Sequence, residues 1–229
     1  MSFITDPNLP ESPVCEAMLG KRYYGILSEG LKRLGIAVFQ VPDNNSVDPR
    51  LAGHADMSAV HLGGRRILIS AAVISLKPEL EKAGYDVTVS GLEQRPDYPN
   101  DIGLNGCISG SSIICMEKAL DKAMTKGRKI INVKQGYAKC SVCVLDKNHL
   151  ITDDPGIKAA SEKNGMNCLY VRKGGIILEG FDHGFIGGSC FKTDKKTIAF
   201  TGTLEKHPDG NKITDHIEKL GMSCVFLTR

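Results

Sequence analysis

The sequence predicts an α/β fold in which five strand-strand-helix-strand repeats close into a ring, a five-bladed α/β propeller. First, the order strand, turn, strand, helix, strand recurs four times between residues 53 and 227. Second, a glycine follows the helix directly in four repeats, where a left-handed cap favours it: Gly35, Gly84, Gly165 and Gly221. Helices that alternate with strands exclude an all-helical bundle and a plain antiparallel sandwich. The lack of a GxGxxG or Walker loop argues against a dinucleotide-binding sheet.

Two central repeats follow this order most closely. The repeat at 53–90 has predicted strands at 57–62 and 66–70, a Gly63-Gly64 turn between them, a helix at 76–83 and a strand at 86–90. The repeat at 98–133 has strands at 102–108 and 112–116, a helix at 117–125 and a strand at 129–133. Both repeats place short β-branched runs on either side of one helical stretch, as a strand-helix-strand unit requires.

The later and earlier parts of the chain complete the set. The repeat at 136–171 has strands at 139–145, 149–152 and 166–171 and a helix at 156–163. The repeat at 182–227 has strands at 185–192, 197–201 and 224–227 and a helix at 211–220. The repeat at 1–42 is less complete, with a predicted strand at 3–5, a helix before Gly35 and a strand at 36–41. We expect a single domain over 1–229, with the strand at 3–5 joining the first or last blade to lock the ring.

Composition indicates an ordinary globular protein. The 229 residues are 41% hydrophobic and 24% charged, and the formal net charge is +3. No run of Lys and Arg is longer than a pair such as Arg65-Arg66 or Lys195-Lys196, so we expect neither a nucleic-acid groove nor a membrane-binding patch. The first residues lack the basic start and apolar core of a signal peptide, and no apolar run approaches the ~18 residues of a membrane span. We therefore expect a cytoplasmic protein.

The eight cysteines are expected to be free thiols in a reducing compartment. Cys115, Cys168 and Cys224 lie in apolar runs, where a thiol packs as a small hydrophobe. Cys140 and Cys143 have CxxC spacing, but no second such pair completes a four-ligand set. The sequence therefore predicts no metal site and no cofactor.

Polar residues begin the strands that should converge on the axis of the ring. These entrances hold His54 and Asp56, then Asn100, Asp101 and Asn105, then Lys139 and Cys140, then Asp182 and His183. Residues 99–101 and 182–184 would also make good turns without any further role. Because four entrances are polar together, we expect a central polar pocket.

Cys140 is the candidate nucleophile of this pocket because it is the cysteine nearest to an entrance. A positive neighbour lowers the pKa of a thiol, and Lys139 is adjacent in sequence. His54 and Asp56 lie two apart, which on a strand places them on one face as an acid/base pair. Cys107 and Cys190 are alternative nucleophiles, and the structural alternative for Cys140 is a small buried filler.

The repeat plan and two motifs resemble the penteins, the fold of the guanidino-group-modifying enzymes. The stretch from Gly53 to Met57 resembles the family's Gly-His-x-Asp triplet, and the stretch from Leu178 to Asp182 resembles its acidic Glu-Gly-Gly-Asp/Asn stretch. The small size is similar to that of an uncharacterised clostridial group and of the ribosome anti-association factor with this fold. Arginine and agmatine deiminases carry their nucleophilic cysteine in a glycine-rich motif near the C-terminus, whereas Cys224 here lies in an apolar closing strand.

The resemblance implies a cysteine-dependent hydrolase or transferase acting on a C–N bond of a guanidine or amidine. Cys140 would attack the central carbon, His54 would carry protons, and Asp56 with Glu179 or Asp101 would hold the planar cation. The expected substrate contacts are Asp101, Asn105, Lys139, Glu179, Asp182 and His183. Since the Lys139 ammonium repels a cation and attracts an anion, the partner expected is a small polar molecule, with zwitterionic and anionic substrates included. The alternative is a non-catalytic protein that binds a small molecule or a macromolecular assembly.

Overall fold

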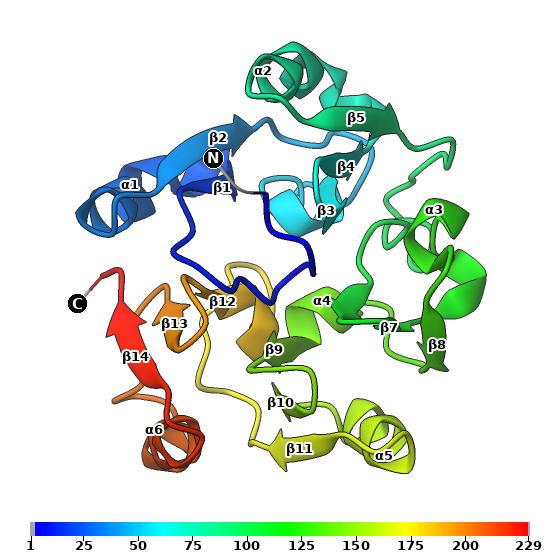
Figure 1. The fold of residues 1–229 in the computed structure, drawn as a ribbon. Helices are drawn as coiled ribbons and strands as arrows, with labels where there is room; N and C mark the ends of the chain where they lie inside the picture. The colour runs from blue at the N-terminus through cyan, green and yellow to red at the C-terminus, as the bar shows by residue number, and fades with distance from the viewer. Residues whose placement is uncertain (1–2, 229) are drawn as a thin grey trace.

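The computed structural model describes residues 3–228, in which five small sheets surround a central axis and most of the helices lie outside them (Figure 1). Four sheets have three strands and one has two. In every three-stranded sheet the first strand is antiparallel to the second, and the second is parallel to the third. The repeated order therefore builds five similar blades, as the sequence predicts.

The first three blades occupy residues 16–132. Blade 1 consists of β1 (Glu16–Gly20), η1 (Lys21–Tyr23), α1 (Tyr24–Arg33) and β2 (Ala37–Val41). Blade 2 consists of η2 (Ala55–Met57), β3 (Ala59–Gly63), β4 (Arg66–Ile69), η3 (Ala71–Leu76), α2 (Lys77–Lys82) and β5 (Asp86–Val89). Blade 3 consists of β6 (Cys107–Ser109), β7 (Ser112–Cys115), η4 (Glu117–Ala119), α3 (Lys122–Thr125) and β8 (Lys129–Asn132).

The last two blades complete the ring. Blade 4 consists of α4 (Ala138–Ser141), β9 (Val142–Val144), β10 (His149–Thr152), α5 (Pro155–Lys163) and β11 (Asn167–Tyr170). Blade 5 consists of η5 (Ile186–Ser189), β12 (Cys190–Lys192), β13 (Thr197–Phe200), α6 (Gly210–Lys219) and β14 (Ser223–Phe226). No helix within residues 3–228 has the length and apolar character needed to span a membrane.

Each blade buries apolar side chains between its sheet and its helix. In blade 2, Ile67 and Ile69 of β4 pack with Leu76 and Leu80, and all four are at most 3% exposed. A glycine with positive φ ends the helix and starts the last strand, as at Gly84 (φ +95) and Gly221 (φ +70). These are left-handed conformations that other residues rarely adopt, so the predicted glycine caps are confirmed.

The ring closes by packing of blade 1 against blade 5. Leu27 and Leu31 of α1 share a cluster with Leu227, and the Arg33 Nη2 atom donates a hydrogen bond to the Leu227 carbonyl at 2.9 Å. Gly30 sits so close to this segment that an added Cβ would lie 2.5 Å from the same carbonyl oxygen. Side-chain packing, rather than strand exchange, therefore joins the two ends of the ring.

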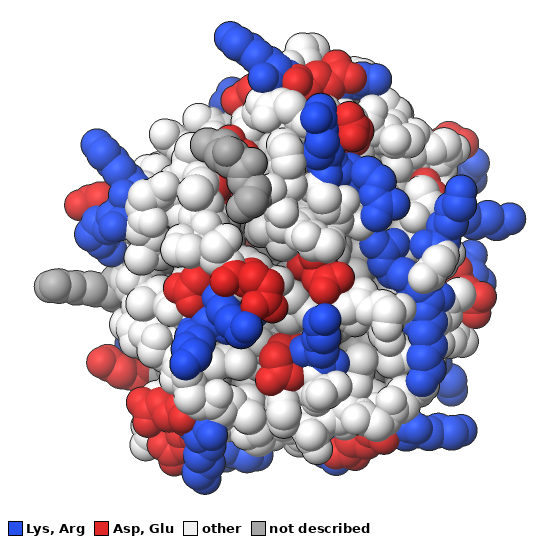
Figure 2. Space-filling model, viewed as in Figure 1, with Lys and Arg blue, Asp and Glu red and all other residues white. Residues whose placement is uncertain are grey.

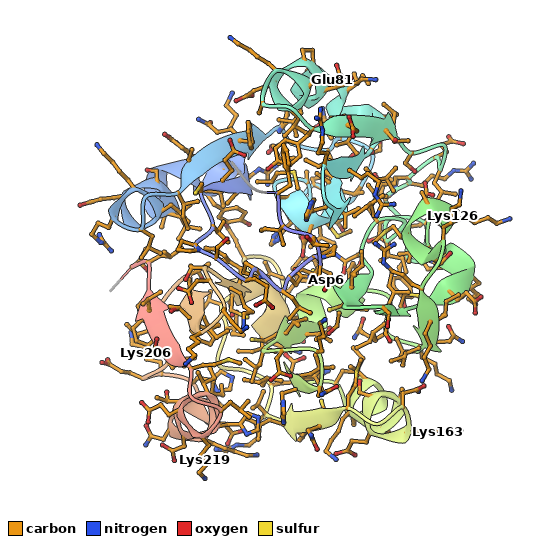
Figure 3. The ribbon with its side chains drawn as sticks, in the orientation of Figure 1. Asp6, Glu81, Lys126, Lys163, Lys206 and Lys219 are labelled. Atoms are coloured by element: carbon orange, nitrogen blue, oxygen red, sulfur yellow. The ribbon has the colours of Figure 1, made fainter. Side chains whose placement is uncertain are left out.

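The predicted strand at 3–5 is wrong. Residues 3–14 contain no strand and run across the middle of the ring, where Figure 1 draws them in dark blue and Figure 3 labels Asp6. Three prolines in this stretch remove N–H donors that a strand would need. We call residues 3–14 the strap, because it binds the hairpin turns of several blades: Gly64 N donates to Ile4 O at 2.8 Å, and Val14 N donates to Thr193 O at 2.7 Å.

The inner strands start later than the sequence predicts. The residues expected at the strand entrances instead form short turns, a 3-10 turn at Ala55–Met57, a loop ending at Gly106, a helical turn at Ala138–Ser141 and a 3-10 turn at Ile186–Ser189. Glycine and asparagine favour turns over strands in two of these stretches, at Asn105-Gly106 and at Gly187-Gly188. The entrance side chains therefore radiate from turns, which lie at the opposite end of the inner strands from the hairpin turns bound by the strap.

Candidate functional site

The entrance turns of blades 2 and 4 bring Asp56 and Cys140 into contact. The Cys140 thiol donates a hydrogen bond to Asp56 Oδ2, with a sulfur-to-oxygen distance of 2.9 Å. Asp56 lies in η2 and Cys140 in the short helix α4. As a whole residue, Cys140 is partly buried. Two of the three predicted catalytic residues therefore meet at one point.

Asn105, from the loop that enters blade 3, joins these two turns. Its Nδ2 atom donates to Cys140 Sγ at 3.2 Å and to the Asp56 carbonyl at 3.3 Å. Its Oδ1 atom accepts from the backbone N–H groups of Lys139 at 3.0 Å and Cys140 at 3.3 Å. Asn105 is fully buried. Because both ends of the amide are used, Asn105 fixes the position of the thiol.

His54 and Asp56 do not stand side by side on a strand, which corrects the expected geometry. His54 has an extended backbone just before η2, whereas Asp56 lies within the 3-10 turn. The His54 Nε2 atom forms a 2.9 Å hydrogen bond with the Tyr23 hydroxyl, and the two rings meet edge to face at 5.3 Å. The Asp56 charge raises the pKa of Tyr23, after the larger effect of burial. His54 and Tyr23 therefore border the site on the side of blade 1.

Asp101 lies behind an aromatic wall on the other side of the site. The Tyr137 hydroxyl donates to Asp101 Oδ2 at 2.5 Å, and Asp101 is 1% exposed. Burial raises the pKa values of both groups. The Tyr137 ring stacks with Phe185 at 6.2 Å and packs against Tyr98 at 5.7 Å. Asp101 therefore holds the wall, and its other carboxylate oxygen has no hydrogen-bond partner among the described residues.

Residues 172–185, which we call the cover loop, carry the remaining predicted contacts. Glu179 and Asp182 are exposed and form no side-chain hydrogen bond within the described part of the chain, so the structure does not bring them onto Cys140. His183 packs edge to face against Phe185 at 5.9 Å. Leu178 packs with Met57 and Tyr137, next to the site. The cover loop thus reaches the site through apolar side chains.

Contact with Asp56 adds to the effect of burial on the pKa of the Cys140 thiol. Burial raises the pKa of Cys140 well above its ordinary value, and the charge of Asp56 and its hydrogen bond raise it further. Asn105 and Lys139 oppose this effect but do not overcome it. The expectation that Lys139 makes Cys140 a low-pKa thiol is therefore wrong, because a carboxylate contacts the sulfur directly. Burial acts to lower the pKa of Lys139. Interactions with Cys107 and then Asp56 outweigh burial, so the pKa of Lys139 is raised overall.

The other cysteines are poorer candidates for a nucleophile. Cys107 is 0% exposed and Cys190 7% exposed, both in apolar clusters. Burial raises the pKa of Cys107 to about 12 and that of Cys224 to about 11. All eight cysteines are free, and among residues 3–228 no three His, Cys, Asp or Glu side chains are grouped as metal ligands would be.

Neither of two surface hollows includes a predicted site residue. One, of about 510 Å³, is lined by residues of blade 3: Met116, Glu117, Lys118, Asn132, Val133 and Lys134. The other, of about 280 Å³, lies at the start of α6. The central polar pocket expected from the sequence therefore stays a prediction.

Sequence reasoning missed Tyr23, Tyr137 and Phe185. Tyr23 ends η1 and Tyr137 directly precedes α4, while Phe185 precedes η5. Tyr137 comes two residues before Lys139, so the polar entrance of blade 4 was a signal that pointed to it. Tyr23 had no such signal, because its role depends on the packing of blade 1 beside blade 2.

Comparison with solved structures places the fold among the penteins. SxtG, an amidinotransferase of the saxitoxin pathway from Microseira wollei, matches with a TM-score of 0.58 and 9% identity, over 97% of this chain and 91% of that chain. Agmatine deiminase from C. jejuni matches with a TM-score of 0.57 and 12% identity, over 100% and 90%. The inosamine-phosphate amidinotransferase StrB1 from Streptomyces griseus matches with a TM-score of 0.54 and 11% identity, over 100% and 92%. At such identities the likeness shows the fold alone.

Comparison of the sequence identifies a family but no characterised relative. The model of a family of unknown function, DUF6873, matches residues 18–229. No curated protein matches this chain in sequence.

Proposed function

The chain belongs to the DUF6873 family of unknown function, and we propose that it is a cysteine-dependent hydrolase or transferase acting on a C–N bond of a guanidine or amidine. One observation carries the proposal: the Cys140 sulfur lies 2.9 Å from Asp56 Oδ2, at the axis of a pentein fold. A nucleophile in contact with a carboxylate suits a cationic carbon centre, because the same carboxylate binds the cation and receives the thiol proton. Solved structures of similar fold include, by their names, two amidinotransferases and a deiminase.

A planar cation fits the surroundings of Cys140. The Asp56 carboxylate accepts two parallel N–H bonds from an amidinium group. The Tyr137 and Phe185 rings, stacked at 6.2 Å, offer an aromatic face on which the cation packs. Leu178 packs against the apolar cluster that contains Met57, the residue after Asp56. The proposed substrate is a small polar molecule with an amidinium or guanidinium group.

The cation also activates the thiol. Without substrate, burial and then the charge of Asp56 raise the pKa of Cys140. When the cation pairs with Asp56, it offsets the negative charge that holds the proton, so the pKa of Cys140 falls. The nucleophile then forms only in the presence of its substrate, which protects the free thiol from side reactions.

The reaction proceeds in two balanced steps. In the first, the Cys140 sulfur forms a bond to the central carbon, one C–N bond breaks, and the departing amine takes the proton released by the thiol. Asp56, which is in contact with the sulfur, accepts that proton, and His54, two residues before Asp56, is the second carrier in this proposal. In the second step, water or an acceptor amine attacks the carbon and the C–S bond breaks. The proton of the attacking group returns to Cys140, which regenerates the free thiol.

Lys139 favours a substrate with a second, anionic group. It adjoins Cys140 in α4, and its side chain forms no ion pair among the described residues. An ammonium near the site attracts a carboxylate or phosphate and repels a substrate that carries positive charge alone. We therefore propose a zwitterionic amidine or guanidine as the substrate class.

Affinity labelling tests the proposal. Chloroacetamidine carries the cation and chloroacetamide is its neutral analogue, so peptide mapping after treatment with each at pH 7.5 reports recognition of charge. We expect Cys140 to react at least about tenfold faster with the amidine, with Cys15 as the exposed internal control that shows no such preference. The Cys140→Ser variant should lose this labelling. Equal, slow labelling of Cys140 by both reagents would reject the enzyme in favour of a non-catalytic binding protein.

A further inference from the structure

Two arginine side chains meet at the hairpin-turn end of the ring. The Nη2 atoms of Arg66 and Arg128 both donate to the carbonyl oxygen of Leu62, at 3.0 and 2.7 Å. These two Nη2 atoms are therefore at most about 5.7 Å apart, the sum of the two distances. Arg66 starts β4 in blade 2, and Arg128 directly precedes β8 in blade 3, so only the fold brings them together.

The two guanidinium groups are fixed by carbonyl oxygens rather than by acids. Arg66 Nε also donates to Gly63 O at 3.3 Å, and Arg128 Nη1 to Met124 O at 2.8 Å. In the described part of the chain, neither arginine forms an ion pair with a carboxylate. Each guanidinium has five N–H donors, and these contacts use two of them. Three donors on each group are left for a ligand or water.

This arrangement is electrostatically unfavourable without an anion. Two like charges at such a separation repel each other, and burial followed by the charge of Arg66 lowers the pKa of Arg128. Burial and then the two arginine charges also act to lower the pKa of the adjacent His61, against its bond to Gly64 O at 2.8 Å. The acid that acts on Arg128 is Asp6 of the strap, whose carboxylate pairs with Lys147 at 3.5 Å.

The surrounding surface is also positive. Figure 2 shows Lys and Arg side chains as a nearly continuous band on the right of the face that the strap crosses, and Figure 3 labels Lys126 beside α3. Arg65 and Lys129, the sequence neighbours of the two arginines, are exposed. Arg65 is partly neutralised by Asp86 at 3.6 Å. The sequence contains only isolated basic pairs, so this band is a product of the ring.

We propose that Arg66 and Arg128 bind the phosphoryl group of a small molecule at a site separate from Cys140. Guanidinium groups bind phosphate oxygens by paired N–H bonds, which a lysine does not match. A phosphoryl dianion offsets both charges, whereas a carboxylate offsets one, so the arginine pair favours phosphate. β3 separates this site from η2, and its four steps from Ala59 to Gly63 span roughly 13 Å.

Inorganic phosphate is the probe that tests the site. At constant ionic strength, we expect phosphate to raise the thermal unfolding midpoint of the wild-type protein more than acetate or chloride does, and ³¹P NMR titration to show saturable binding. Arg66→Gln and Arg128→Gln should each weaken phosphate binding at least tenfold. Arg95→Gln is the matched control, because Arg95 is exposed and pairs with Glu93 at 3.3 Å on another loop; it should bind phosphate as the wild type does.

Two results would overturn the phosphate site. One is a phosphate effect no larger than that of acetate, with no saturable ³¹P signal. The other is equal phosphate binding by the wild type and a folded Arg66→Gln variant. If the glutamine variants do not fold, Arg66→Lys keeps the positive charge but removes the paired N–H donors of the guanidinium group. Phosphate binding that is undiminished in Arg66→Lys would contradict the proposal equally. Amidine labelling of Cys140 should be unchanged in every folded variant, so the two sites are tested independently.

Discussion

The Cys140 sulfur and the Asp56 carboxylate lie 2.9 Å apart although 84 positions separate them in the sequence. Two different blades supply them, and Asn105 from a third blade holds both turns in place. Burial and this contact raise the pKa of the thiol in the free protein, and a cation paired with Asp56 would lower it. Recognition of charge and activation of the nucleophile are therefore the same event at this site.

Removal of the Asn105 side chain should destabilise the protein as well as the site. Asn105→Ala leaves the Cys140 N–H group and the Asp56 carbonyl without this partner, while the Lys139 N–H group keeps a 3.3 Å bond to the backbone carbonyl of residue 105. Because each unsatisfied buried group costs about 1–3 kcal/mol, we expect a loss of about 2–4 kcal/mol in the free energy of unfolding. Urea denaturation measures it. The control Asn164→Ala removes one bond, to Ala160 O at 2.9 Å, and should cost less than half as much.

Arg50 holds the cover loop against the rest of the protein. It donates to Gly180 O at 3.0 Å, and its guanidinium lies 4.3 Å from the centre of the Phe181 ring. Arg50→Ala should loosen the cover loop and raise severalfold the rate at which a bulky maleimide labels Cys140. Arg50→Lys should have a smaller effect, because it keeps the positive charge and loses only the planar guanidinium group. Peptide mapping checks this against Arg95→Ala. A rate unchanged in Arg50→Ala would show that the loop does not limit access.

Asp153 makes stability depend on pH in a predictable direction. Burial raises its pKa from 3.8 to about 6, and its Oδ1 atom has no hydrogen-bond partner among the described residues. The folded protein therefore binds a proton more tightly than the unfolded chain does. The stability associated with the protonated form is present below pH 4 and is lost as the pH rises through about 6.

The Asp153→Asn variant should not lose stability as the pH rises through about 6, because it has no carboxyl group to ionise at this position. Above pH 6 its free energy of unfolding should exceed that of the wild type by up to about 3 kcal/mol, and the difference should shrink as the pH falls from 6 to 4. Urea denaturation at several pH values measures the difference between the two proteins, in which other titrating groups cancel. A difference that does not change with pH would contradict the raised pKa of Asp153.

The blades were predictable because their signals are local. Gly84 and Gly221 mark the helix ends by a backbone conformation that one residue type prefers, and apolar periodicity marks the neighbouring strands. Entrance geometry was not predictable to the same degree. Short turns such as Ala55–Met57 resemble strand starts in composition, and their shape depends on bonds such as that between Asp56 and Cys140.

The candidate site was predictable in its members but not in its electrostatics. Cys140, Asp56 and Asn105 were chosen because they open polar strands, and the fold brings them into contact. Sequence adjacency suggested that Lys139 controls the thiol, whereas a carboxylate from another blade does so. The pairing of Arg66 with Arg128 likewise depends on two blades lying side by side, for which the sequence carries no local signal.

The pH dependence of Cys140 alkylation in the wild type and in Asp56→Asn tests the central claim most directly. Loss of the carboxylate should lower the pKa of Cys140, so chloroacetamide should react about tenfold faster at pH 7.5, since each pKa unit changes the thiolate fraction tenfold. The preference for chloroacetamidine should disappear in the same variant. Asp97→Asn removes a carboxylate that bonds to Asn100 on another loop and should change neither rate. An Asp56→Asn protein that keeps the wild-type rates with both reagents would contradict the account.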